Sequence, residues 1–246
     1  MPNHRSRSFA LCMVSAASLV AACGVALALP SDEVGVGSGS AQQPVVVELF
    51  QSQGCSSCPP ANAYLNAIAD RPDVLALSFA VTYWDRLGWK DTFGSPRFTA
   101  RQQDYAAAGR GQVATPEIIV NGSHAVVGAD KPAFDAAIAK AGAPRGGPAI
   151  MVDGTSVRIG AGAAGKAATV WLVRYDPKSR DVPIRAGENG GRTLPHRDIV
   201  RELAKLGDWS GSSTSFPLPP ARERGLSTAI LVQRGAGGPI IAARKL

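Results

Sequence analysis

Cysteine, histidine and aromatic residues are scarce in this chain of 246 residues, which contains four cysteines, three histidines and 6% aromatic residues. The sequence has no serine, histidine and aspartate set at a recognisable spacing and no cluster of histidines, so nothing supports a hydrolase. A glycine-rich loop that could cradle phosphate is also missing, which removes support for a nucleotide-binding enzyme. The few cysteines are therefore the strongest candidates for chemistry.

The excess of positive charge is spread along the chain. Twenty-six lysines and arginines face 19 aspartates and glutamates, for a net charge of +7. No run of five or more basic residues occurs, and no basic segment is interleaved with aromatic side chains that could stack on bases. We expect a soluble basic surface and no nucleic-acid partner.

The first thirty residues have the pattern of an export signal. Two arginines precede an apolar stretch from Phe9 to about Leu29, and residues 26–28 have the small-x-small pattern of a cleavage site. We predict a signal peptide over 1–28 and a flexible linker over 29–43, and hence a periplasmic or secreted bacterial protein. The alternative is a lipoprotein box ending at Cys23, and a membrane partner is expected only if that cysteine is lipidated.

Cleavage after residue 28 would remove Cys12 and Cys23, and the two cysteines that remain form a CxxC motif at Cys55 and Cys58. The apolar run before them predicts a buried strand over 45–51, and the two prolines after them fit the first turn of a helix. A helix N-terminus favours a thiolate through its dipole and its free amides. A bridge across two residues constrains the unfolded chain little, which favours a redox role over a structural clip or a metal site. We predict Cys55 as the attacking thiolate and Cys58 as the resolving thiol.

The elements that follow alternate between helices and strands. We predict a helix over 61–69, a strand over 74–82, a helix over 95–108, a strand leading into an Asn-Gly hairpin over 113–128, and a helix over 130–141. A strand, a helix and a second strand in this order imply a βαβ unit with two parallel strands.

Several motifs resemble a known family. ELFQSQGCSSCPP, the loop YWDRLGWKD and TPEIIVNG are similar to the DUF1223 family of secreted bacterial proteins with a thioredoxin-like domain, and GENGGRTLPHRDIVRELAKLGDW at 187–209 resembles its C-terminal part. The resemblance implies an α/β fold, with a thioredoxin-like domain over 44–143. It also implies that Pro116 is a cis-proline facing the CxxC pair, with Thr115 beside the sulfurs.

The composition changes at 144–148, which we interpret as a domain boundary. Short alternating runs separated by turn residues follow it, and they predict a smaller, mainly antiparallel β domain over 148–246. The apolar residues within 199–206 fit a helical face, although residues 198–203 could also form an edge strand.

Other residues could assist the cysteines. Glu48 lies in an apolar strand, where it could take a proton from the resolving thiol or pair with a nearby cation. Trp84, Asp85 and Trp89 could line a groove for a substrate peptide, or they could plug the core beneath a long connection.

Two histidines offer a different chemistry. His124 and His196 are isolated in the sequence, and either could join the two thiolates around copper or zinc. Because an exposed hairpin histidine is the commoner case, we predict no metal ligand and no cofactor.

The function that these patterns favour is an exported thiol–disulfide oxidoreductase. Its partners would be protein dithiols or disulfides and a redox partner in the cell envelope. Two other functions stay open. One is a copper- or metal-binding chaperone that uses the same thiols, and the other is a non-catalytic thioredoxin-like binding module.

Overall fold

The computed structural model describes residues 40, 42–163 and 165–246. The predicted signal peptide, with Cys23 in it, and most of the predicted linker lie outside the described residues. All described residues fall in one compact unit. Within this part of the chain, no helix is long and apolar enough to cross a membrane.

The described part of the chain contains thirteen β-strands, three α-helices and one 3-10 helix. In chain order they are β1 (Val45–Gln51), α1 (Cys58–Ile68), β2 (Val74–Ala80), η1 (Asp85–Leu87), α2 (Pro96–Ala107), β3 (Glu117–Val120), β4 (His124–Val127), α3 (Lys131–Ala141), β5 (Ile150–Asp153), β6 (Ser156–Ile159), β7 (Ala168–Asp176), β8 (Arg180–Pro183), β9 (Thr193–His196), β10 (Ile199–Trp209), β11 (Thr214–Pro217), β12 (Ser227–Arg234) and β13 (Ile240–Lys245).

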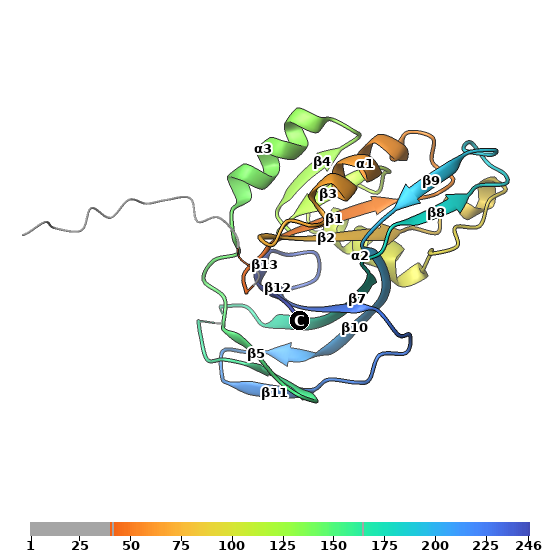
Figure 1. Ribbon diagram of the computed structural model, residues 1–246. Coiled ribbons are helices and arrows are strands. Elements are labelled where there is room, and N and C mark those ends of the chain that lie inside the picture. The colour runs from red at the N-terminus through yellow and green to blue at the C-terminus, as the bar shows by residue number, and fades with distance from the viewer. Residues whose placement is uncertain (1–39, 41, 164) are drawn as a thin grey trace, which may run out of the picture. The chain divides into compact units, whose positions relative to one another are not determined.

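Eight strands form one mixed sheet in the order β13-β12-β7-β10-β2-β1-β3-β4 (Figure 1). β1 and β2 run parallel, with Val45 opposite Val74 and α1 as the crossover. β3 and β4 extend the sheet antiparallel beyond β1. On the other side, β10 runs parallel to β2 through the pair Ile199 and Ser78, and β7, β12 and β13 follow antiparallel.

Both faces of the central strands are covered. α1 and α3 lie over one face of β1 to β4 (Figure 1), with Leu49, Leu65 and Phe134 in the apolar layer between them. The opposite face packs Phe50 and Tyr105 of α2 together, at 6.0 Å between ring centroids, among side chains of β7, β10 and β12. A strand that is buried on both faces is apolar along most of its length, and residues 45–51 follow this pattern apart from Glu48 and Gln51.

Two smaller sheets complete the described fold. The strands β11, β6 and β5 form a three-stranded sheet, and its Val157 and Ile159 pack with Trp209 against β7 and β12. The strands β8 and β9 form a hairpin beside α1 (Figure 1), where the Asn66 side-chain amide donates to the Pro195 carbonyl at 3.3 Å. The loop of this hairpin, residues 184–192, points the chain back toward the CxxC motif.

The predicted fold class, a thioredoxin-like α/β domain over 44–143 followed by a smaller antiparallel β domain, is wrong. The described chain is mostly β, and strands from both sides of residues 144–148 share the eight-stranded sheet. The physical reason is the free edge of β2, which β10 pairs: the Ser78 amide donates to the Asp198 carbonyl at 2.8 Å. A sheet edge that is paired in this way is no longer exposed to water or to other chains.

The helical face that residues 199–206 suggested is also absent. These residues belong to β10, a strand of 11 residues that lies between β7 and β2 rather than at an edge.

Candidate functional site

The cysteines lie at the turn between β1 and α1. The Cys55 amide donates to the Ser52 carbonyl at 3.1 Å, and the Cys58 amide donates to the Cys55 carbonyl at 3.2 Å, so two successive turns reverse the chain. α1 begins at Cys58, and a proline follows in its first turn, where a missing amide hydrogen costs nothing. The two Cα atoms are 5.5 Å apart, and the sulfurs are close enough for a disulfide bond.

The turn presents its serines rather than its sulfurs to solvent. Cys55 and Cys58 have 0% exposed surface, whereas Ser56 and Ser57 between them are exposed. The Ser57 hydroxyl lies 3.3 Å from the Cys55 sulfur. The sulfurs are therefore one side chain below the surface, and a substrate reaches them only if the residues around the turn move.

Thr115 and Pro116 lie against the same turn. β3 pairs antiparallel with β1, with Phe50 opposite Glu117, so the start of β3 meets the end of β1. The Thr115 carbonyl oxygen lies 3.8 Å from the Cys55 sulfur. The peptide bond between Thr115 and Pro116 is cis, as the resemblance implied. The structure thus brings together Cys55, Thr115 and Pro116, which the sequence separates by 60 residues.

The aromatic loop after β2 divides into two parts. The Trp84 indole nitrogen donates to the Thr115 hydroxyl at 2.7 Å, which holds Trp84 beside the cysteine turn. Tyr83, Trp84, Arg86, Leu87, Val113, Ala114 and Thr115 line a groove of about 330 Å³ there. Leu87 and Val113 are about half exposed on its walls, so the groove is mainly apolar.

The other two loop residues hold the loop itself. The Trp89 indole nitrogen donates to the Gln53 side-chain oxygen at 2.9 Å, and the Asp85 carboxylate accepts the Asp91 amide at 3.1 Å. Asp91 is buried, and its carboxylate accepts the amides of Gln53 and Phe93 at 2.7 and 2.9 Å. Burial raises the pKa of Asp91 to about 6, although these hydrogen bonds lower it. These contacts fix residue 53, two positions before Cys55.

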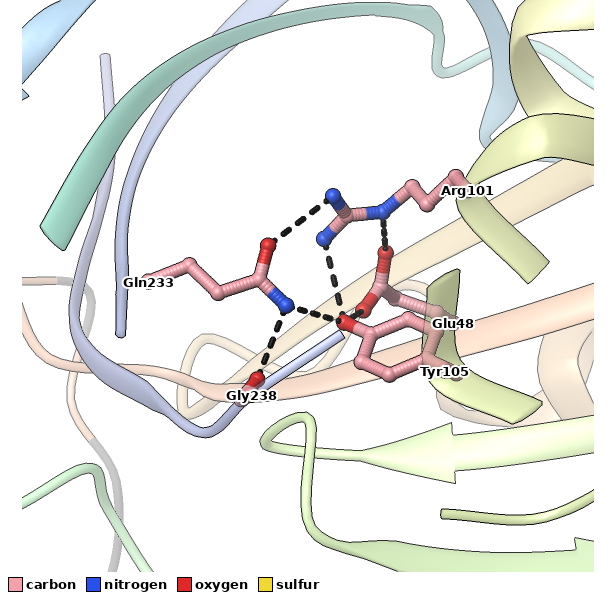
Figure 2. A network of polar contacts seen from close by, with 5 residues as sticks. All are labelled: Glu48, Arg101, Tyr105, Gln233 and Gly238. Carbon is pink, nitrogen blue, oxygen red and sulfur yellow. Dashed lines mark hydrogen bonds and ion pairs between the residues drawn. The ribbon is translucent and has the colours of Figure 1, made fainter. Parts of the chain in front are cut away.

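Glu48 belongs to a different cluster, on the α2 side of the sheet (Figure 2). Its carboxylate accepts the Arg101 Nε at 2.6 Å and the Tyr105 hydroxyl. Arg101 also donates to the Gln233 side chain and to the Tyr105 hydroxyl, both at 3.1 Å. Burial acts to lower the pKa of Arg101, yet the attraction of Glu48 and Tyr105 raises it above its ordinary value.

The Glu48 carboxylate therefore forms an ion pair with Arg101 and accepts a hydrogen bond from Tyr105. Pairing with a cation was the alternative to a proton relay that the sequence left open. None of the hydrogen bonds of Glu48 leads to the cysteines. Arg101 and Tyr105 both come from α2, and both also contact Gln233 of β12, so this cluster joins the early and late parts of the chain inside the core.

Neither histidine joins the cysteines. Among the residues that the structure describes, no three His, Cys, Asp or Glu side chains gather closely enough to hold a metal ion. His196 is buried in β9 and packs edge-on against Phe93, with ring centroids 6.1 Å apart. Burial lowers the pKa of His196 to about 4, so the imidazole is neutral at neutral pH.

Two residues near the cysteine turn were missed by the sequence reasoning. The Glu188 carboxylate accepts the amide and the hydroxyl of Ser56, at 3.0 and 2.7 Å. The Asn189 side-chain amide donates to the carbonyls of Gln53 and Cys55, at 3.0 and 2.8 Å. Their separation from Ser56 and Cys55 is 132 and 134 residues, and no local pattern predicts which distant loop will cover a turn.

Comparison with known proteins identifies the family without an activity. No curated protein matches the chain. A crystal structure of a protein from Agrobacterium tumefaciens is 34% identical, with a TM-score of 0.66, and the match covers 82% of this chain and 93% of that one. HBP35 of Porphyromonas gingivalis is a weaker match, at 14% identity and a TM-score of 0.48 over 85% of this chain and 76% of that one. The model of a family described as "Protein of unknown function (DUF1223)" matches residues 46–233, and this chain belongs to that family.

Proposed function

We propose that this protein exchanges disulfides with protein substrates through Cys55 and Cys58, and that it does so outside the cytoplasm of a bacterium. The observation that carries the proposal is the cysteine pair itself: two sulfurs close enough for a disulfide, at the start of a helix and directly beneath two exposed serines. Helix N-termini favour the thiolate, which is the reactive form of cysteine.

The neighbours of the pair suit a peptide substrate. The Thr115 carbonyl beside the Cys55 sulfur is a backbone group that an extended peptide can pair with, and the groove next to it has apolar walls. We propose Thr115, Pro116 and Trp84 as substrate-binding residues. Asp85 and Trp89 would act through the loop that they hold.

The reduced protein would reduce a substrate disulfide in two steps. The Cys55 thiolate attacks one sulfur of a substrate disulfide, which forms a mixed disulfide and releases the other substrate sulfur as a thiolate. The Cys58 thiolate then attacks the Cys55 sulfur, which forms the Cys55–Cys58 disulfide and releases the second substrate thiolate. The substrate gains two electrons, the protein loses two, and water supplies the protons for the departing thiolates. The reverse sequence oxidises a substrate dithiol.

The likeness to thioredoxin-type proteins that we propose is limited to this local arrangement of two cysteines and a facing Thr-Pro. The mixed eight-stranded sheet is a different architecture. Export follows from the predicted signal peptide, which we would test by fractionating cells that express the full chain.

The test traps the reaction halfway. The Cys58→Ser variant of the full chain is incubated with a disulfide-containing protein such as insulin, and the products are separated without reductant and mapped by mass spectrometry. We expect a mixed disulfide at Cys55, because the thiol that would resolve it is missing. The Cys55→Ser variant is the matched control, and it should trap far less.

Two results would remove the proposal. Equal behaviour of both variants and the wild type, with no mixed disulfide, would leave a non-catalytic module. A metal ion that co-purifies at one per chain and is lost in either cysteine variant would replace disulfide exchange by metal binding.

A further inference from the structure

The loop of the β8–β9 hairpin brings a negative charge to the cysteine turn. One carboxylate oxygen of Glu188 accepts both the backbone amide and the hydroxyl of Ser56, at 3.0 and 2.7 Å. These hydrogen bonds lower the pKa of Glu188, so the side chain is ionised at neutral pH. The charge therefore lies one residue from Cys55.

Asn189 fixes that loop in place. It is fully buried, and its amide nitrogen bridges the carbonyls of Gln53 and Cys55. Its side-chain oxygen accepts the guanidinium of Arg192 at 2.6 Å. Both polar atoms of the Asn189 side chain therefore make hydrogen bonds. These bonds fix the loop, and with it the neighbouring Glu188, against the cysteine turn.

The charge of Glu188 opposes the effect that α1 has on the cysteine. A helix N-terminus stabilises a nearby anion, and the first turn of α1 contains no acidic residue of its own. Glu188 supplies that anion from another part of the chain, and its carboxylate accepts the hydrogen of the Ser56 backbone amide. A Cys55 thiolate would then be a second negative charge at the same helix end, and like charges disfavour each other.

The other groups at the turn do not cancel this effect. The Ser57 hydroxyl, 3.3 Å from the Cys55 sulfur, is neutral. The loop holds two cations: Arg192 donates to the Asn189 side-chain oxygen, and the Arg185 side chain is exposed. The carboxylate of Glu188 is the charge that contacts the CxxC residues directly.

We infer that Glu188 is a positioning residue that disfavours the Cys55 thiolate and thereby biases the cysteine pair toward its disulfide form. The inference rests on the proposed function and gives it a direction. A couple whose reduced form is destabilised gives up electrons readily, so the dithiol form would reduce substrate disulfides and would itself be restored by a dithiol reductant.

The test compares Glu188→Gln with the wild-type full chain. The first readout is the pKa of the Cys55 thiol, from the pH dependence of its alkylation by iodoacetamide, with Cys55 resolved by mass spectrometry. The second is the ratio of disulfide to dithiol in glutathione buffers. Glu223→Gln is the control for a lost surface charge, because Glu223 lies in the loop between β11 and β12 and contacts Arg201 of β10.

We expect Glu188→Gln to lower the pKa of Cys55 by about one unit, because an adjacent charge typically shifts a pKa by that order. In glutathione buffers whose pH lies above the Cys55 pKa of both proteins, the equilibrium between disulfide and dithiol should move about tenfold toward the dithiol, which corresponds to about 30 mV for a two-electron couple. Glu223→Gln should match the wild type in both readouts. An unchanged or higher Cys55 pKa in Glu188→Gln would overturn the inference.

The outcome separates this inference from the proposed function. If Cys58→Ser traps a mixed disulfide while Glu188→Gln leaves the Cys55 pKa unchanged, disulfide exchange stands and the role of Glu188 falls. If no mixed disulfide forms while Glu188→Gln lowers the pKa, the effect of the charge stands and the exchange function falls.

Discussion

The buried pair of Glu48 and Arg101 gives the sharpest prediction about stability. The Glu48 side chain is 0% exposed and the Arg101 side chain 4%, so both charges are out of water and depend on each other. In Glu48→Gln the guanidinium stays buried while its counter-charge is gone. Removing one partner of a buried ion pair typically costs about 3 to 5 kcal/mol, and we expect a loss of unfolding free energy in that range.

A double-mutant cycle separates the loss of the Glu48–Arg101 ion pair from the loss of side-chain packing. Glu48→Gln combined with Arg101→Met removes both charges, so the double variant should lose less free energy than the sum of the two single variants. We expect a coupling of about 2 kcal/mol or more, since residues in one network couple by about 0.5 to 3 kcal/mol.

Urea titrations of the wild type and the three variants, followed by tryptophan fluorescence, measure these differences. Trp171 packs on the Arg101 guanidinium, 5.6 Å from ring centre to carbon, and therefore reports on this part of the core. A Glu48→Gln variant within about 1 kcal/mol of the wild type would refute the reasoning, because surface substitutions already reach about half of that. A normal stability together with slow resolution of the mixed disulfide would instead restore Glu48 as a proton relay.

Three further changes test other parts of the fold. Asn189→Ala leaves the carbonyls of Gln53 and Cys55 without their side-chain donor, and urea titration should show a loss of about 2 to 4 kcal/mol in unfolding free energy. An unchanged urea midpoint would show that these two hydrogen bonds do not stabilise the fold. For His196, whose folded pKa of about 4 lies below its ordinary 6.5, stability is complete above pH 6.5 and is lost as the pH falls toward 4. The His196→Phe variant should therefore gain about 3 kcal/mol on the wild type across that window, and parallel pH curves would disprove the burial effect. Gly237→Ala should lower the melting temperature more than Gly128→Ala, because both glycines have positive φ but only Gly237 would clash, with the Asp104 carbonyl; equal shifts would argue against the close approach.

Local patterns were sufficient for many elements. The sequence predicts a helix over 95–108, and in the structure Ser95 caps α2 by accepting the Arg97 amide at 3.3 Å through its hydroxyl. The strand before the cysteines, the helix after them and the Asn-Gly turn between β3 and β4 were also predictable, because each depends on residues adjacent in the chain.

β10 shows why the overall architecture was not predictable. Its register shifts twice, between Val200 and Glu202 and between Lys205 and Gly207. Each bulge adds a residue that has no partner, so buried side chains such as Val200 and Leu203 fall three apart, which is a helical spacing. β10 pairs with β2 through the backbone edge of a strand more than a hundred residues earlier in the chain. The side-chain pattern of β10 does not indicate which strand edge it will pair with.

The candidate site divides in the same way. The CxxC motif and the Thr-Pro before β3 were visible as short motifs, and the structure brings them together. The residues that cover these motifs could not be predicted. Glu188 and Asn189 contact the cysteine turn from a distant loop, and the composition of that loop predicts only a change of chain direction. Glu48 looked catalytic from its strand position alone, and its ion pair with Arg101 depends on how α2 packs across the sheet.

The pairing of β10 with β2 sets an order of events during synthesis. A ribosome releases β1, the cysteines and β2 more than a hundred residues before residues 188 and 199, so the nascent chain carries a bare strand edge and an uncovered cysteine turn until those residues emerge. Bare edges recruit other chains. A fragment cut after α3 would keep the bare edge of β2 permanently, and we expect it to aggregate where the whole protein does not.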